Sequence, residues 1–203
     1  MPSVALNPGE PGVIETLRNA TRSCHAKLEL CPAMVRLFDP GYSLSEYRAH
    51  LGRLLGLIEP LEWAVTFAAH PPDPVCSIKR SLQLREDLQH MGVTQREIDK
   101  IERCRRLPKI TNAGLRGYNY VILGSLLGGK VIARQLRATL GPDASLQFYG
   151  DAKACYGALW ASFCQDLEEN GKSDLPIICQ TAVALFDLYG EWFSDPLPGT
   201  GAR

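Results

Sequence analysis

Residues 117–134 read GYNYVILGSLLGGKVIAR, and this is the most informative stretch of the chain. It is apolar and long enough for several helical turns, yet it contains four glycines: Gly117, Gly124, Gly128 and Gly129. Each glycine inside a helix costs roughly 1 kcal/mol relative to alanine, so the four oppose this helix by about 4 kcal/mol. That is a large share of the stability of a small domain. A helix that keeps these glycines needs what glycine provides, namely close approach of the backbone to a flat surface and freedom to bend.

Small residues gather on one face of this helix when the stretch is placed on a helical wheel. The face contains Gly114, Gly117, Val121, Gly124, Ser125, Gly128 and Ile132. One interpretation is a close helix–helix crossing, for which the spacing of Gly124 and Gly128 is typical. The other is a helix laid against a planar ligand, and the stretch alone leaves both open. Lys130 and Arg134 make the stretch too charged for a confident membrane span.

Length and composition indicate one globular domain. The chain has 203 residues, is 45% apolar, and balances 22 basic against 22 acidic residues. A net charge of zero argues against a nucleic-acid partner bound by bulk charge. We expect a domain over residues 13–193, with a disordered tail over 1–12 and a second tail over 194–203.

The cellular compartment is inferred from the N-terminus and the cysteines. Residues 1–12 lack the basic and apolar regions of a secretion signal. No transmembrane segment is apparent either, so no membrane partner is expected. The seven cysteines are odd in number, widely spaced and without a C-x-x-C pair, which makes a poor disulfide framework and a poor zinc site. We therefore predict a cytoplasmic protein with reduced cysteines.

The pattern of apolar residues predicts an all-α fold. Apolar residues recur at helical spacing and no segment alternates convincingly with period two, which predicts about seven or eight helices. The expected helices cover residues 13–30, 43–69, 77–91, 94–104, the glycine-rich stretch after Pro108 up to Gly141, 147 or 151 to 169, and 174–193. Ser43 with Glu46, and Thr94 with Glu97, fit capping boxes at two helix starts.

Three of the four histidines have adequate structural explanations. His90 lies near a helix C-terminus, where a cation is favourable. His70 precedes two prolines at a helix end, and His50 lies at the margin of an apolar face. None of the three is needed to explain a function.

His25 differs because it lies in the centre of an apolar helix face. Arg22 and Arg18 lie one and two turns before it, and Glu29 follows one turn later. A carboxylate that holds one ring nitrogen makes the imidazole a better metal ligand. A histidine on an apolar face is more often a core residue. Together with the glycine face and the nearby cations, however, this one suits a planar, anionic, iron-bearing macrocycle.

These segments resemble the bacterial, biliverdin-producing haem (heme) oxygenases. Residues 120–132, YVILGSLLGGKVI, are similar to the distal helix of that family, and residues 17–29, LRNATRSCHAKLE, to its proximal helix. Further similarity to its last two helices is carried by Phe148, Tyr149, Gly150, Trp160, Phe163, Ala182, Phe186 and Trp192. The resemblance covers almost the whole chain in the expected order, and it implies a single-domain helical bundle.

The resemblance also implies a role for each residue of the site. His25 is expected to be the axial ligand of the iron of haem b (heme b), with Glu29 as its hydrogen-bond partner. The residues expected over the distal face, where catalysis takes place, are Gly124, Ser125, Gly128 and Gly129. The residues expected to contact the cofactor, chiefly through its propionates, are Arg18, Thr21, Arg22, Lys27 and Tyr120.

The activity implied is oxidative cleavage of haem to biliverdin, carbon monoxide and ferrous iron. Haem is then both substrate and cofactor. O2 is the oxidant, and electrons come from an external ferredoxin or reductase because the chain has no flavin or nicotinamide fingerprint. The alternative is a non-catalytic haem-binding or haem-trafficking protein, which is favoured by Leu123, where many bacterial members have glutamate. Cys24, beside His25, is interpreted as a packing residue, with a second interpretation as an alternative iron ligand.

Overall fold

The computed structural model describes residues 11–69, 75, 78–150 and 155–194, and all regular structure within these ranges is helical. The helices are α1 (Val13–Glu29), α2 (Pro32–Arg36), α3 (Leu44–Ala68), α4 (Arg80–His90), α5 (Gln95–Asp99), α6 (Leu115–Leu140), the 3-10 turn η2 (Gly141–Asp143), α7 (Gln147–Gly150), α8 (Cys155–Asn170) and α9 (Leu175–Ser194). The all-α prediction is confirmed. The nine α-helices in these ranges slightly exceed the expected seven or eight, and Pro32 begins an additional short helix. His70 lies outside the described residues.

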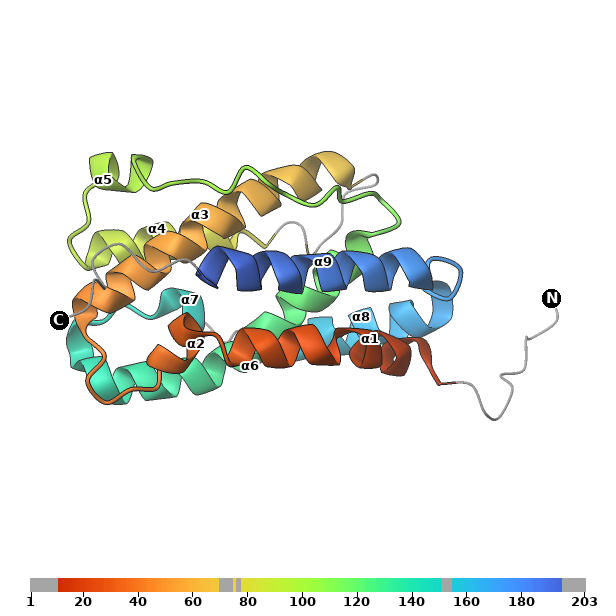
Figure 1. The fold of residues 1–203 in the computed structure, drawn as a ribbon, viewed down its shortest axis with the longest axis horizontal. Coiled ribbons are helices and arrows are strands. Elements are labelled where there is room, and N and C mark those ends of the chain that lie inside the picture. Colours follow the sequence, from red (N-terminus) through yellow and green to blue (C-terminus); the bar gives the residue numbers. More distant parts are fainter. Residues whose placement is uncertain (1–10, 70–74, 76–77, 151–154, 195–203) are drawn as a thin grey trace.

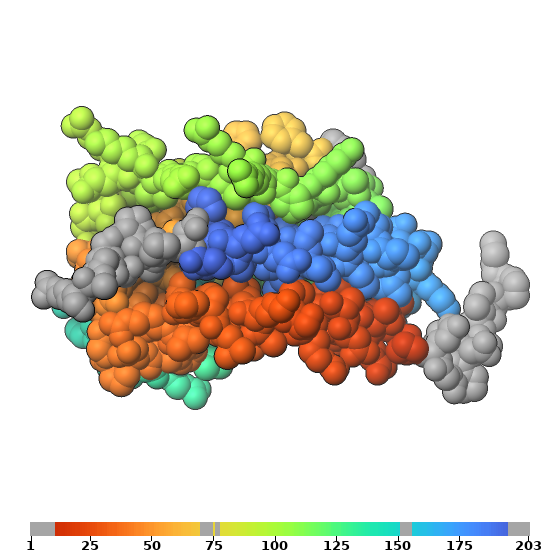
Figure 2. Space-filling view, viewed as in Figure 1, coloured from red at the N-terminus to blue at the C-terminus, as the bar shows by residue number. Residues whose placement is uncertain are grey.

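Helix α9 is the central element of the bundle. Figure 1 shows it crossing the middle of the molecule, with α3 along one side and α1 along the other. It packs most extensively against α1 and α6, while α3 packs against α4. Figure 2 shows the same order on the surface, where α9 separates α1 from the segment that follows α5. Helix α9 therefore supports both helices that carry the predicted site.

Side-chain caps fix the starts of three helices. Both predicted capping boxes are confirmed: the amide of Glu46 donates to Ser43 Oγ at 3.2 Å, and that of Glu97 to Thr94 Oγ1 at 3.4 Å. The start of α1 is capped from another helix, because Glu168 of α8 accepts hydrogen bonds of 2.9 Å from the amides at positions 13 and 14. This cap ties the helix of His25 to α8.

Helix α5 is shorter than predicted, because the helix expected over 94–104 ends at Asp99. The residues that follow are bound to α3 instead. The Cys104 amide donates to the Gly56 carbonyl at 2.8 Å, and Arg103 Nε donates to Glu59 at 2.6 Å. These bonds take the place of the helical ones, so the predicted second half of this helix is wrong.

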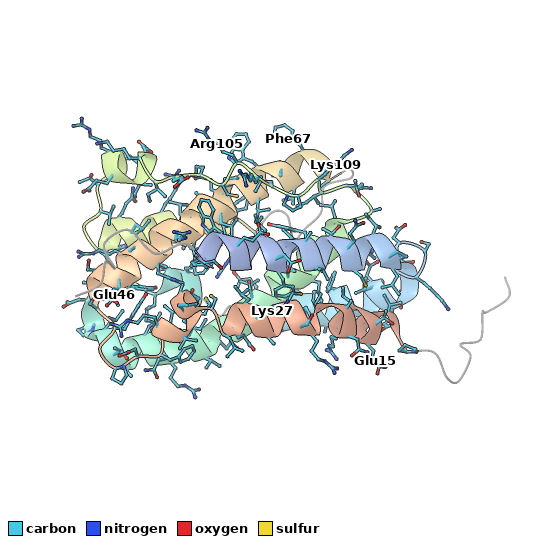
Figure 3. The ribbon with its side chains drawn as sticks, viewed as in Figure 1. Glu15, Lys27, Glu46, Phe67, Arg105 and Lys109 are labelled. Carbon is cyan, nitrogen blue, oxygen red and sulfur yellow. The ribbon has the colours of Figure 1, made fainter. Side chains whose placement is uncertain are left out.

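The segment after α5 runs along the outer side of α3. In Figure 3 the side chains of Arg105 and Lys109 point outward from it, with Phe67 of α3 between them. All three are exposed. This edge of the molecule lies across α9 from α1, so it does not contribute to the site described below.

The first half of the glycine-rich helix makes a close crossing with α9. A Cβ atom at Gly114 would lie 2.5 Å from Thr181 Oγ1. One at Gly117 would collide with the Ile178 carbonyl oxygen and lie 3.0 Å from the Ala182 amide nitrogen. Such separations are far below van der Waals contact, so only glycine allows the two backbones to approach this closely. The helix-crossing interpretation therefore holds for this half of the stretch.

Candidate functional site

The second half of the glycine-rich helix has an open face. A Cβ atom at Gly124 or at Gly128 would meet no heavy atom within 4 Å beyond its own helix and chain neighbours. Packing within the chain therefore does not require glycine at these positions, although each costs roughly 1 kcal/mol in a helix. With glycine at both positions, the space beside the backbone stays clear.

Two exposed apolar side chains extend this open face. Leu127 is 37% exposed and Val131 is 64% exposed. With Gly124 and Gly128 they follow the i, i+3, i+4, i+7 spacing of one helix face. We call these four residues the open strip. The sequence interpretation missed Leu127 and Val131, although this spacing could have identified them.

His25 and Glu29 lie together on α1, as predicted from their spacing. His25 Nδ1 lies 3.6 Å from Glu29 Oε1, and the His25 side chain is 54% exposed. The Phe186 ring of α9 contacts the imidazole edge-on, with ring centroids 5.2 Å apart. The Nδ1 separation from the Glu29 carboxylate is longer than a hydrogen bond. Because Nδ1 faces this carboxylate, Nε2 is the nitrogen left for a ligand.

A contact between two hydroxyl groups sets the register between α1 and α6. Thr21 Oγ1 lies 3.3 Å from the Tyr120 hydroxyl. Both helices run in the same general direction from this contact (Figure 1). His25 and Gly124 each follow it by four residues, or about 6 Å of helix. The imidazole and the open strip therefore lie at the same level of the bundle.

Aromatic and basic residues surround the contact between Thr21 and Tyr120. The Tyr120 ring packs against Trp160 of α8, with centroids 5.9 Å apart. Arg18 and Arg22 are exposed on α1 before His25, and Arg22 donates a 2.7 Å hydrogen bond to Asn19. Two guanidinium groups at this end suit a ligand with carboxylates, because arginine matches carboxylate geometry.

Lys27 lies apart from the two arginines. It lines a cavity of about 260 Å³ between α1 and α9, together with residues such as Phe186 and Glu191. Figure 3 shows Lys27 on the face of α1 seen in front of the bundle. The structure thus brings Arg18, Thr21, Arg22 and Tyr120 to one end of the site and leaves Lys27 outside that group.

The fit to an iron porphyrin follows from these side chains. Within the described ranges, no three histidine, cysteine or acidic residues come together in a metal-binding cluster. The open strip adds clear space and exposed apolar surface, which suit a flat apolar ring.

Comparison with known proteins agrees with this arrangement. The family model described as Heme oxygenase matches residues 12–195. The chain belongs to the haem oxygenase family. No curated protein matches it. In the described part of this family member, no helix is both long enough and apolar enough to cross a membrane.

Gly129, one of the predicted distal residues of this haem oxygenase family member, lies on another face of α6. It is buried, and a Cβ atom there would lie 3.2 Å from the Tyr149 carbonyl oxygen of α7. Ser125 is exposed, and its hydroxyl donates to the Ile122 carbonyl at 2.7 Å. Of the four predicted distal residues, only Gly124 and Gly128 belong to the open strip.

Two departures from the family pattern have structural explanations. Leu123 is completely buried, so it anchors α6 through apolar packing. The Cys24 thiol is also buried and donates to the Thr21 carbonyl at 3.1 Å. Burial raises the pKa of this thiol, which disfavours the thiolate that binds metals. The packing interpretation of Cys24 is therefore the better supported one.

His50 is a buried residue that sequence reasoning placed only at the margin of an apolar face. Its Nε2 lies 2.7 Å from the Tyr149 hydroxyl, and its ring packs against Phe193. Desolvation lowers the pKa of His50 to about 3, so the imidazole is neutral at ordinary pH. Nothing in the sequence pattern indicated Tyr149 as its partner, because 99 residues separate the two.

Proposed function

We propose that this chain is an active haem oxygenase, which cleaves haem to biliverdin, carbon monoxide and ferrous iron using O2 and external electrons. Its membership of the family supports haem as the ligand. The observation that carries the proposal is the clear space beside Gly124 and Gly128, on the helix whose Tyr120 contacts Thr21 of α1. A bare backbone at this position would let α6 approach a flat ring closely, and both turnover and tight binding of haem make use of such an approach.

The residues have distinct tasks in this proposal. His25 would hold the iron of a bound haem, and Glu29, beside Nδ1, would help to orient the imidazole. The open strip would let the α6 backbone lie close to a bound ring and would keep bulky side chains away from it. Arg18 and Arg22 bind the propionates and fix the rotation of the ring in its plane. When bound, haem supplies the iron that activates O2 and the ring carbon that is oxidised.

The electrons come from a ferredoxin or a reductase, and the protein works in the cytoplasm. Its free thiols support this location, because a reducing compartment keeps cysteines unpaired. The free cysteines within the described ranges are Cys24, Cys31, Cys104, Cys164 and Cys179. Cell fractionation tests the location, and recovery of the protein outside the cytoplasm would contradict it.

Haem turnover is the test of the activity. Haem is added to the purified protein, followed by ascorbate or a ferredoxin system under air, and the absorption spectrum is recorded. We expect the Soret band to disappear while the broad red absorption of biliverdin rises. A stable haem spectrum under good electron supply would instead indicate the non-catalytic, haem-binding alternative. Leu123 is buried in the core, and its departure from the family's glutamate is the feature that favours that alternative.

A further inference from the structure

The described part of α7, Gln147–Gly150, lies between η2 and α8 in the chain. Side chains from two other helices, α3 and α4, hold it in place.

Asp87 of α4 holds the start of α7. It is completely buried, and its carboxylate accepts three hydrogen bonds. The Ser145 hydroxyl donates at 2.6 Å, and the amides of Gln147 and Phe148 donate at 2.8 Å each. A charged acceptor on backbone amides makes stronger hydrogen bonds than a neutral one. Asp87 therefore acts as a cap supplied from another helix.

Two further side chains hold the rest of α7. Arg80 of α4 donates to the Phe148 carbonyl at 2.5 Å, with its guanidinium 4.0 Å from the centre of the Phe148 ring. His50 of α3 is hydrogen-bonded to the Tyr149 hydroxyl. These buried contacts attach α7 firmly to α3 and α4.

The opposite side of α7 presses on α6 at Gly129. The Tyr149 carbonyl oxygen would lie 3.2 Å from a Cβ at this position, so the two backbones touch where any side chain would force one of them to move. Gly129 directly follows Gly128 of the open strip. A displacement of α7 is therefore transmitted to the backbone of the strip.

We propose that Asp87 is a positioning residue, which sets the place of the open strip relative to His25 by holding α7 against Gly129. This inference rests on the proposed function, since it concerns the same haem site. Asp87 itself touches no part of that site. The position of the strip determines which edge of a bound ring stays accessible to the oxidant, so Asp87 influences where the ring is opened.

The test compares Asp87→Asn with a matched control, Glu59→Gln. Both replace a partly or fully buried carboxylate with an amide, but the partners of Glu59 are Arg85 and Arg103, which lie outside α6 and α7. Gly129→Ala perturbs the contact between α7 and Gly129 from the α6 side. It replaces Asp87→Asn in the test if Asp87→Asn does not fold. Three properties are measured: amide hydrogen exchange of the haem-free protein over residues 124–130, the biliverdin isomers formed, and the pH midpoint of the ferric haem spectrum.

We expect Asp87→Asn to speed amide exchange over 124–130 by roughly tenfold or more, the scale of one lost hydrogen bond to a charged group. We expect Asp87→Asn and Gly129→Ala to change the isomer ratio and the spectral midpoint, and Glu59→Gln to leave all three as in the wild type. Unchanged exchange in Asp87→Asn, or equal changes in Glu59→Gln, would overturn the inference. If the wild type forms no biliverdin, the proposed activity fails, but the exchange comparison still decides whether Asp87 positions the strip.

Discussion

Replacing Gly124 and Gly128 together by alanine should separate the ligand-binding role of the glycines from their packing role. No heavy atom lies within 4 Å of either added methyl group beyond the helix and chain neighbours, so neither group clashes. Helix propensity then dominates, and two substitutions at roughly 1 kcal/mol each should stabilise the haem-free protein by about 2 kcal/mol. For a chain of this size we expect the melting temperature to rise by roughly 4–8 °C.

The same two substitutions should weaken haem binding. Two methyl groups on the open strip hold a bound ring away from the α6 backbone. Loss of contact over roughly 50 Å² corresponds to about 1.3 kcal/mol. The affinity should therefore fall about tenfold. Titration of the Soret absorbance measures the haem affinity. Thermal melting of the haem-free protein measures the gain in stability.

Gly117→Ala is the matched control for this prediction. It makes the same chemical change on the same helix, but its methyl group collides with the Ile178 carbonyl of α9. Overpacking of this kind costs about 1–3 kcal/mol. A collision with a backbone oxygen belongs at the upper end of this range, above the gain of roughly 1 kcal/mol in helix propensity. We expect a lower melting temperature. The reasoning is refuted if the Gly124 and Gly128 variant melts below the wild type, or if it binds haem as tightly.

Three further predictions concern the buried and exposed histidines. His25→Ala should abolish the histidine-type haem spectrum, and added imidazole should restore it; a spectrum that survives the substitution would show that the ligand lies elsewhere. Glu29→Gln should raise the reduction potential of bound haem in a spectroelectrochemical titration, because a carboxylate makes the imidazole a stronger donor, and an unchanged potential would mean that Glu29 does not act on the ring. Burial lowers the pKa of His50 to about 3, below the value of about 6.5 in an unfolded chain. The unfolded state thus binds more protons between these values, and stability should fall by about 2 kcal/mol from pH 7 to pH 5. Chemical denaturation should show a smaller fall in the double variant His50→Leu, Tyr149→Phe, and an equal fall would contradict the assignment to His50.

Local features of the fold could be predicted from the sequence. Helix α1 begins at Val13 as expected, and both capping boxes form where serine or threonine precedes glutamate by three residues. The pairing of His25 with Glu29 depends only on the helical repeat, which places residues four apart on one face. These features are decided within one or two turns of chain.

Features that depend on distant neighbours could not be predicted. The end of α5 is set by the bond between Cys104 and Gly56, which lie far apart in the sequence. The burial of His50 against Tyr149 likewise depends on a contact between α3 and α7. A periodic pattern indicates which face of a helix is special, but it does not identify what lies opposite.

The glycine-rich helix shows where this division falls. Its sequence alone determined that a helix at this place tolerates an unusual number of glycines and that small residues share one face. Only the tertiary structure decided that Gly117 serves the crossing with α9, that Gly129 receives α7, and that Gly124 and Gly128 face clear space. The physical reason is that glycine is selected by what approaches it from outside the helix, and that neighbour comes from elsewhere in the chain or, at the open strip, from a ligand.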